Sequence, residues 1–68
     1  MDTLTKEELQ ESRRAIDSTI GKCEKAQLKV KAGSPQHTLL TRRIKAFYIA
    51  SALIQRELET LAQIEGGI

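Results

Sequence analysis

The sequence has few of the side chains that build small self-contained cores. Its 68 residues include one tyrosine, one phenylalanine, no tryptophan, one proline and one cysteine. A chain this short forms a single domain, residues 1–68, with room for two or three elements of secondary structure. Two aromatic side chains leave little bulky apolar volume for a core. We therefore expect one small domain that is not a self-sufficient globular monomer.

The lone cysteine and the polar start of the chain exclude further classes. Cys23 cannot form an intrachain disulfide, and one cysteine cannot build a metal knuckle, so neither a metal nor a cofactor is expected. The first residues are polar and acidic, unlike a signal peptide, and no apolar run approaches the length of a membrane span. These features favour a cytoplasmic protein with no membrane partner.

Patterns of catalytic residues are also lacking. The one histidine, His37, has no carboxylate near it in sequence to orient it as a general base. Cys23 recurs with the apolar residues of a helical stripe, away from an activating base. Paired carboxylates, H-E-x-x-H, a Walker loop and a dinucleotide fingerprint are all missing from the sequence. The sequence therefore predicts that this protein is not an enzyme.

Apolar periodicity predicts a first helix over about residues 5–31. Thr5 and Glu8 have the S/T-x-x-E spacing of a capping box, in which each side chain satisfies a free backbone N–H. A thin apolar stripe follows, with one member every seven residues. Its members are Leu9, Ile16, Cys23 and Val30.

A turn at 32–34 and a second helix over about 35–64 come next. Gly33 suits the left-handed cap that ends a helix, Ser34 is a good N-cap, and Pro35 fits the first position of a new helix. A link this short makes the two helices antiparallel neighbours. The predicted fold class is therefore all-α, an antiparallel two-helix hairpin.

The second helix has a wider apolar face than the first. Its main row follows the 4-3 spacing of a helical bundle, and a second row widens it. Because the thin stripe of the first helix cannot cover both rows, we expect hairpins to assemble through the second helix into an oligomeric bundle. The predicted oligomer interface consists of Leu40, Ile44, Phe47, Ala50, Ile54, Leu58 and Leu61. The second row consists of Leu39, Ala46, Ala50, Leu53 and Ile64.

Charge is divided between the turn and the two ends. Residues 21–56 carry eight cations and one anion, Glu24, a net charge of +7. Residues 1–20 carry a net charge of −2 and residues 57–68 a net charge of −3. Folding the hairpin gives a basic tip and an acidic base, and crowded cations favour an anion supplied from outside.

The predicted ligand site lies at this basic tip. Its members supply positive charge, hydrogen bonds around the start of the second helix, where the helix dipole is positive, and one aromatic surface for stacking. They are Lys22, Lys25, Lys29, Gln36, His37, Thr38, Thr41, Arg42, Arg43, Lys45 and Tyr48. Simpler roles are open to the same residues: a capped turn, a solvated row of lysines, or docking of the tip onto the acidic ends of another copy.

The segment 33–46, from Gly33 to Ala46, resembles a segment of small helical-hairpin proteins of Gram-positive bacteria and their phages that have no assigned function. By size, helicity and charge alone, the chain is also similar to phage sponge proteins, which sequester the cyclic nucleotides and ADP-ribose derivatives of bacterial immune signalling. The resemblance implies a phosphorylated small molecule as ligand, an anti-defence role and, if the chain is phage-encoded, the cytoplasm of a bacterial host.

Three functions are therefore open at this stage. The leading hypothesis is a homo-oligomeric, non-enzymatic protein that sequesters a phosphate-bearing small molecule, a nucleotide, at its tip. The alternative is a protein–protein interaction module or inhibitor that uses the apolar face of the second helix. A further alternative is nucleic-acid binding, which predicts affinity for long DNA or RNA that falls steeply with salt.

Overall fold

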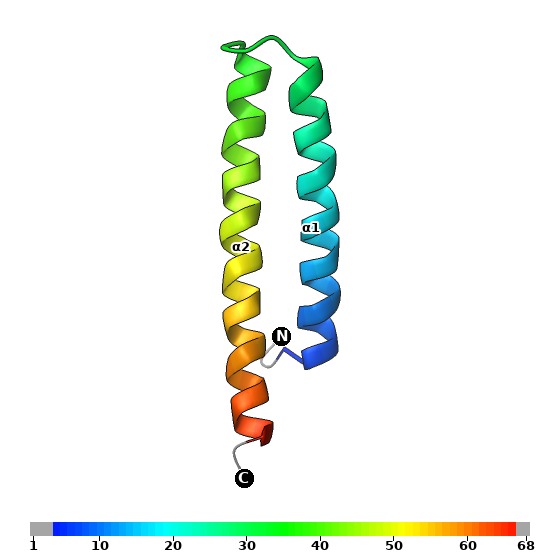
Figure 1. Cartoon of the computed structure of the whole chain (residues 1–68), viewed down its shortest axis with the longest axis vertical. Coiled ribbons are helices and arrows are strands. Elements are labelled where there is room, and N and C mark those ends of the chain that lie inside the picture. The colour runs from blue at the N-terminus through cyan, green and yellow to red at the C-terminus, as the bar shows by residue number, and fades with distance from the viewer. Residues whose placement is uncertain (1–3, 67–68) are drawn as a thin grey trace.

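The computed structural model describes residues 4–66, which form two α-helices joined by a short turn (Figure 1). Helix α1 runs over Lys6–Lys29 and helix α2 over Pro35–Gly66. The two lie side by side in opposite directions, and the molecule measures 53 × 20 × 15 Å. The predicted all-α two-helix fold is therefore confirmed for these residues.

The start of α1 is fixed by the capping box that the sequence predicts. Glu8 N donates to Thr5 Oγ1 at 3.0 Å, and Thr5 N donates to Glu8 Oε1, also at 3.0 Å. Two acidic residues, Glu7 and Glu8, lie in the first turn, where the helix dipole favours negative charge. The backbone N–H groups of Thr5 and Glu8 are thereby satisfied, and this capping box marks where the helix begins.

The end of α1 differs from the expectation. The helix stops at Lys29 because Val30 takes an extended conformation, with φ −105° and ψ 154°. Ser34 N then donates to Lys31 O at 3.1 Å, closing a four-residue turn in which Gly33 has φ +83°. Gly33 therefore supplies the positive φ of this turn, and does not cap α1. The second glycine of interest, Gly21, lies inside α1, which is continuous through it.

Ser34 caps the start of α2. Its Oγ accepts a hydrogen bond from His37 N at 3.2 Å, and its carbonyl accepts one from Thr38 N at 3.0 Å. Pro35, at the first helical position, has no N–H to satisfy. From there α2 continues without interruption and extends beyond the first turn of α1 at the base of the hairpin (Figure 1).

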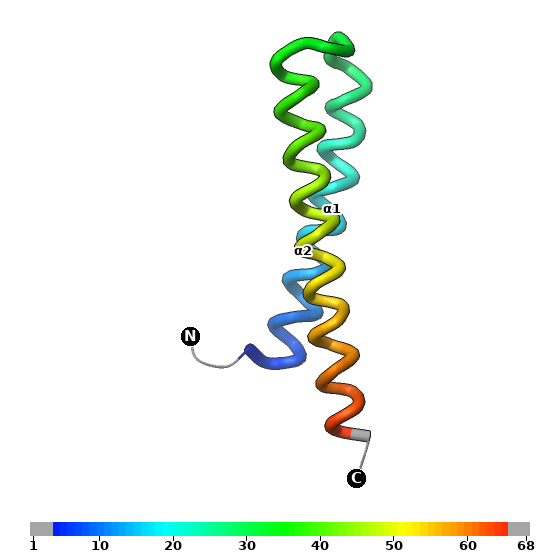
Figure 2. The backbone as a smooth tube through the Cα atoms, turned by 90° about the vertical axis from the view of Figure 1, so that its left-hand side faces the viewer, coloured from blue at the N-terminus to red at the C-terminus, as the bar shows by residue number. Residues whose placement is uncertain are grey.

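The interface between the helices is a narrow seam. On α1, Leu9 and Ile20 are each 5% exposed, and they are the buried hydrophobic residues of the described chain. Apart from Ser51, which is buried, the seam side chains of α2 are half-buried, since only α1 covers them. Figure 2 shows the two helices crossing near their middles, so that they separate toward the base. A single hairpin thus buries only a strip of each helix.

Candidate functional site

One flank of the seam joins the helices through polar side chains. Thr41, Tyr48 and Gln55 of α2 are spaced seven residues apart, so they form one row along the helix. Each of the three is hydrogen-bonded to a residue of α1. Nearer the tip, Gln27 Nε2 donates to Thr41 Oγ1 at 2.7 Å. Tyr48 donates its phenol proton to Glu24 Oε2 at 3.1 Å. We call this side of the hairpin the polar flank.

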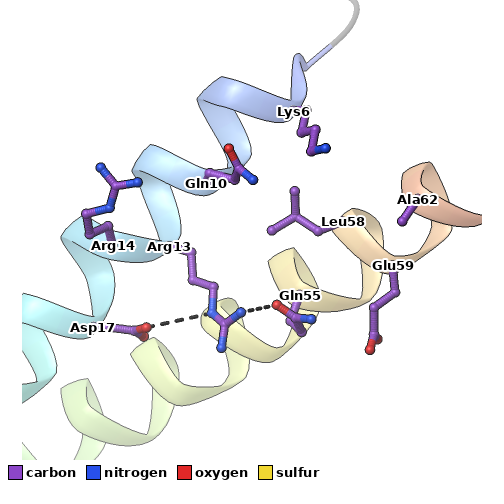
Figure 3. A pocket seen from close by; sticks show the side chains of 9 residues that line it. All are labelled: Lys6, Gln10, Arg13, Arg14, Asp17, Gln55, Leu58, Glu59 and Ala62. Atoms are coloured by element: carbon purple, nitrogen blue, oxygen red, sulfur yellow. Dashed lines mark hydrogen bonds and ion pairs between the residues drawn. The ribbon is translucent and has the colours of Figure 1, made fainter. Parts of the chain in front are cut away.

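A cluster of four polar residues occupies the middle of the polar flank. Arg13 Nη1 donates to Gln55 Oε1, and Ser51 Oγ donates to Asp17 Oδ1 at 2.8 Å. Arg13 Nε lies 3.7 Å from Asp17 Oδ2 and has no hydrogen-bond partner among the residues that the structure describes. Figure 3 shows the Arg13 side chain between Asp17 of its own helix and Gln55 of α2. These contacts join the first half of α1 to the middle of α2.

Two open grooves follow the polar flank. The first, toward the base, is bordered by the Lys6–Glu65 ion pair, whose Nζ and Oε2 atoms are 3.8 Å apart. It is lined by Lys6, Gln10, Arg13, Arg14, Asp17, Gln55, Leu58, Glu59 and Ala62 (Figure 3). The second is lined by Arg13, Asp17, Ile20, Gly21, Glu24, Tyr48, Ser51, Ala52 and Gln55. Neither groove contains one of the six cations predicted to bind a ligand.

The phenol of Tyr48 is the titratable group that this environment perturbs. Its hydrogen bond to the Glu24 carboxylate, together with the negative charge of that carboxylate, raises the pKa of Tyr48 above its ordinary value. The side chain is 53% exposed at the rim of the seam. Tyr48, predicted as a stacking surface, is therefore engaged in a contact between the helices.

The opposite flank of the seam is apolar and uncovered. The second row of α2 runs along it: Leu39 is 45% exposed, Leu53 55% and Ile64 62%, and Ala46 is exposed as well. Leu39, Ala46 and Leu53 are spaced seven residues apart, as are the three polar residues of the other flank. Ile49, 52% exposed, widens the row. We call this side the apolar flank.

Helix α1 contributes small residues to the apolar flank. Ser12, Thr19 and Ala26 are spaced seven apart, on the side of α1 away from Arg13 and Glu24. Thr19 Oγ1 donates a 2.9 Å hydrogen bond to the backbone carbonyl of Ala15, one turn earlier in the same helix. Its hydroxyl is thereby satisfied within the helix, so this flank offers an apolar methyl group to a neighbour.

The seven residues predicted to form the oligomer interface line the seam of the hairpin itself. All of them are half-buried, which places them against α1 of the same chain. They are Leu40, Ile44, Phe47, Ala50, Ile54, Leu58 and Leu61. The second row lies outside this seam, and apart from Ala50 its residues are exposed in the hairpin.

The six predicted ligand-binding cations do not converge within one hairpin. Lys22, Lys25 and Lys29 each follow a buried or half-buried residue of α1 by two positions, which is about 200° around the helix, so they face away from α2. On α2, Arg42 and Lys45 also lie opposite the seam. Arg43 lies beside the second row. All six side chains are exposed, and none takes part in an ion pair within residues 4–66.

Of the hydrogen-bonding residues predicted at the tip, Thr41 is the one whose side chain is bonded within the described hairpin. The hydroxyl of Thr41 receives the Gln27 amide and donates to the His37 carbonyl at 2.9 Å. The backbone N–H groups of His37 and Thr38 are bonded to Ser34. His37 is half-buried, and Gln36 and Thr38 are exposed. The backbone N–H groups at the start of α2 are thus partly used by the cap, while the hydrogen bonds of the structure engage only the Thr41 side chain among the four.

The polar cluster of Arg13, Asp17, Ser51 and Gln55 was not predicted from the sequence. Two signals pointed to it: a serine at a seam position of α2, and the i, i+4 spacing of Arg13 and Asp17. Within residues 4–66, no group of three His, Cys, Asp or Glu side chains is arranged to hold a metal ion. Neither helix there has the length and apolarity needed to cross a membrane.

The flanks of the hairpin thus have different character, one polar and internally bonded, the other apolar and open. Comparison with family models, curated proteins and solved structures found no match to this chain.

Proposed function

We propose that this chain is a non-enzymatic interaction module that packs its apolar flank against another helical surface. The observation that carries the proposal is the exposure of Leu39, Leu53 and Ile64 along one flank of α2. Covering apolar surface contributes about 25 cal/mol per Å², so a continuous row of this kind favours association.

The polar contacts of the hairpin support the choice of this flank. On the polar flank, Tyr48 and Gln55 already have partners on α1, so a neighbour would have to replace existing bonds. On the apolar side, the hydroxyls of Thr19 and Thr60 are bonded to carbonyls of their own helices. A helix packed there would cover the methyl groups of these two threonines, and their hydroxyls would keep the partners that they already have.

A charge placed on the apolar flank tests the proposal. Leu53→Glu puts a carboxylate in the second row, and Ala52→Glu is the matched control on an exposed position outside that row. We expect Leu53→Glu to abolish association, measured by sedimentation of the purified protein and of labelled protein in a bacterial lysate. Ala52→Glu should sediment like the wild type. Identical sedimentation of Leu53→Glu and the wild type in both samples would overturn the proposal.

A second candidate function is binding of a phosphate-bearing small molecule, such as a nucleotide, at the basic tip. It is favoured by the six exposed cations, which have no ion-pair partner within the described residues. Because these cations face outward in several directions, such a site would need cations from more than one hairpin.

Thermal shifts test this second function. Phosphate, sulfate and a panel of nucleotides and cyclic dinucleotides should raise the melting temperature, and Arg42→Ala or Arg43→Ala should remove the shift without changing the mass in solution. No shift across the panel would contradict it. A preference for long DNA or RNA that falls steeply with salt would indicate nucleic-acid binding instead.

A further inference from the structure

Resting on the proposed function, we propose that the occupant of the apolar flank is a second copy of this chain, turned end over end. In this arrangement α2 packs against α2 and α1 against α1, each pair antiparallel, and the two hairpins form a four-helix bundle. The two hairpins are related by a twofold axis that passes across the middle of the flank.

The second row is nearly symmetric about the middle of α2. The centre of Pro35–Gly66 lies between Ala50 and Ser51. Leu39 lies eleven positions before Ala50, and Ile64 lies thirteen positions after Ser51. An end-over-end copy therefore brings Leu39 of one chain close to Ile64 of the other, so that apolar side chains meet along the whole flank.

The two charged residues that interrupt the second row have matching positions. Arg43 lies seven positions before Ala50 and Glu57 lies six positions after Ser51, on the same flank, so their distances from the centre differ by one residue. Both side chains are exposed, and neither has an ion pair within residues 4–66. In the antiparallel pair, Arg43 of each copy faces Glu57 of the other, and the symmetry makes this contact twice.

Helix α1 shows the same complementarity along its length. Its first turns carry Glu7, Glu8 and Glu11, and its last turns carry lysines, all exposed. Antiparallel packing of α1 against α1 places the acidic turns of one copy beside the basic turns of the other. Packing two copies in the same direction would instead bring together their two basic stretches, residues 21–56, which each carry a net charge of +7. The charge pattern therefore selects the end-over-end orientation.

The small residues of the apolar flank allow close packing on the α1 side. Ser12, Thr19 and Ala26 give this side of α1 a low profile, whereas α2 offers leucine and isoleucine. The distance between packed helices depends on the size of the side chains at the contact. The α1 pair can therefore approach closely while the α2 pair buries the larger apolar side chains.

Disulfide trapping tests the orientation directly. In a Cys23→Ser background, Leu39→Cys and Ile64→Cys are made as separate proteins, and one carries an affinity tag so that a mixed dimer has its own mass. We expect the oxidised mixture to form mostly the mixed dimer, with little cross-linking of either protein alone. Cross-linking of Leu39→Cys with itself in preference to the mixture would overturn the proposal, and so would no cross-linking in any sample.

Charge reversal supplies an independent test. Arg43→Glu and Glu57→Arg should each weaken the dimer about five- to tenfold, and the double variant should return to within about twofold of the wild-type dissociation constant. Additive weakening in the double variant would contradict the facing pair.

The outcomes separate this inference from the proposed function. If Leu53→Glu abolishes association but the trapped dimer is parallel, or if the purified wild type is monomeric and associates only in lysate, the second-copy inference fails and the interaction module stands. If Leu53→Glu changes nothing in either sample, both fail.

Discussion

Ser51 Oγ donates a 2.8 Å hydrogen bond to Asp17 Oδ1 and so joins α2 to α1 at the middle of the hairpin. Ser51 is 9% exposed and is the buried polar residue of the seam. A hydroxyl in that position needs an acceptor, and the side chain of Asp17, half exposed to solvent, provides one without burying its charge. The bond fixes how far one helix can slide along the other.

Replacing this serine tests its contribution to stability. Ser51→Ala removes the bond between the helices and leaves Asp17 free to be hydrated, so we expect the free energy of unfolding to fall by about 1 kcal/mol. Urea unfolding followed by circular dichroism, at one protein concentration for all variants, measures the change.

The chain offers a matched control for this substitution. Ser18→Ala makes the same chemical change at an exposed position of α1 and should leave stability within about 0.5 kcal/mol of the wild type. Equal effects of the two substitutions would mean that the Ser51–Asp17 bond contributes nothing beyond helix propensity.

Alanine substitution of Gly21, inside α1, and of Gly33, in the turn, should change stability in opposite directions. Gly21 lies inside α1, and a Cβ there would meet no atom within 4 Å. Gly21→Ala should therefore stabilise the hairpin by about 0.5–1 kcal/mol, because alanine is the better helix former. Gly33 has φ +83°, so Gly33→Ala should destabilise it by about 1 kcal/mol or more.

Thermal melting of the two alanine variants checks these signs. The melting temperature should rise for Gly21→Ala and fall for Gly33→Ala relative to the wild type. A rise for Gly33→Ala would show that the turn does not need the left-handed conformation in solution.

The hydrogen bond between Tyr48 and Glu24 makes a prediction about the pKa of Tyr48, which absorbance can follow. Because this carboxylate accepts the phenol's hydrogen bond and repels its ionised form, the pKa of Tyr48 is raised in the folded chain. The stabilisation from this contact is therefore complete below the ordinary pKa of tyrosine and is lost as the pH rises through the folded value.

The variant Glu24→Gln isolates this effect. It should lower the pKa of Tyr48 toward the ordinary value, and since the chain has one tyrosine, absorbance of the phenolate reports that group alone. Glu11→Gln, on an exposed position of α1 outside this contact, should leave the titration unchanged. A Tyr48 titration that is the same in Glu24→Gln and the wild type would show that the contact is not formed in solution.

The elements were predictable from the sequence because their signals are local. The capping box of Thr5 and Glu8, the N-cap at Ser34 and the apolar rows of α2 each involve residues within a few turns of one another. Gly33 shows the limit of such reasoning. Its need for positive φ was readable, but whether it ends α1 or serves in the following turn depends on the path that the chain takes to α2.

The site was harder to predict because it depends on which of the two apolar rows of α2 packs against α1 and which stays exposed. The spacing of α2 shows a main row and a second row, yet either could face α1. In the structure the main row faces α1, and the polar contacts agree with this choice: Ser51 of the seam bonds to Asp17, and Gln55 bonds to Arg13 at its border. The sequence predicted one site that combines the three lysines of α1 with Arg42 of α2. In the structure both sets lie on the outer sides of their helices, so they do not meet within one hairpin.

The dependence of association on salt distinguishes the two ways of pairing the hairpins. In the end-over-end dimer, opposite charges such as Arg43 and Glu57 face each other, so salt should screen an attraction and weaken the dimer. In a dimer with both tips at one end, salt would screen a repulsion and strengthen it.

Because the Debye length falls from about 10 Å at 0.1 M to about 3 Å at 1 M, the dissociation constant of the end-over-end dimer should rise several-fold over that range. Sedimentation at a series of sodium chloride concentrations measures it, and the variant Arg43→Gln/Glu57→Gln should show a smaller rise. A dissociation constant that falls with salt would contradict the antiparallel pairing.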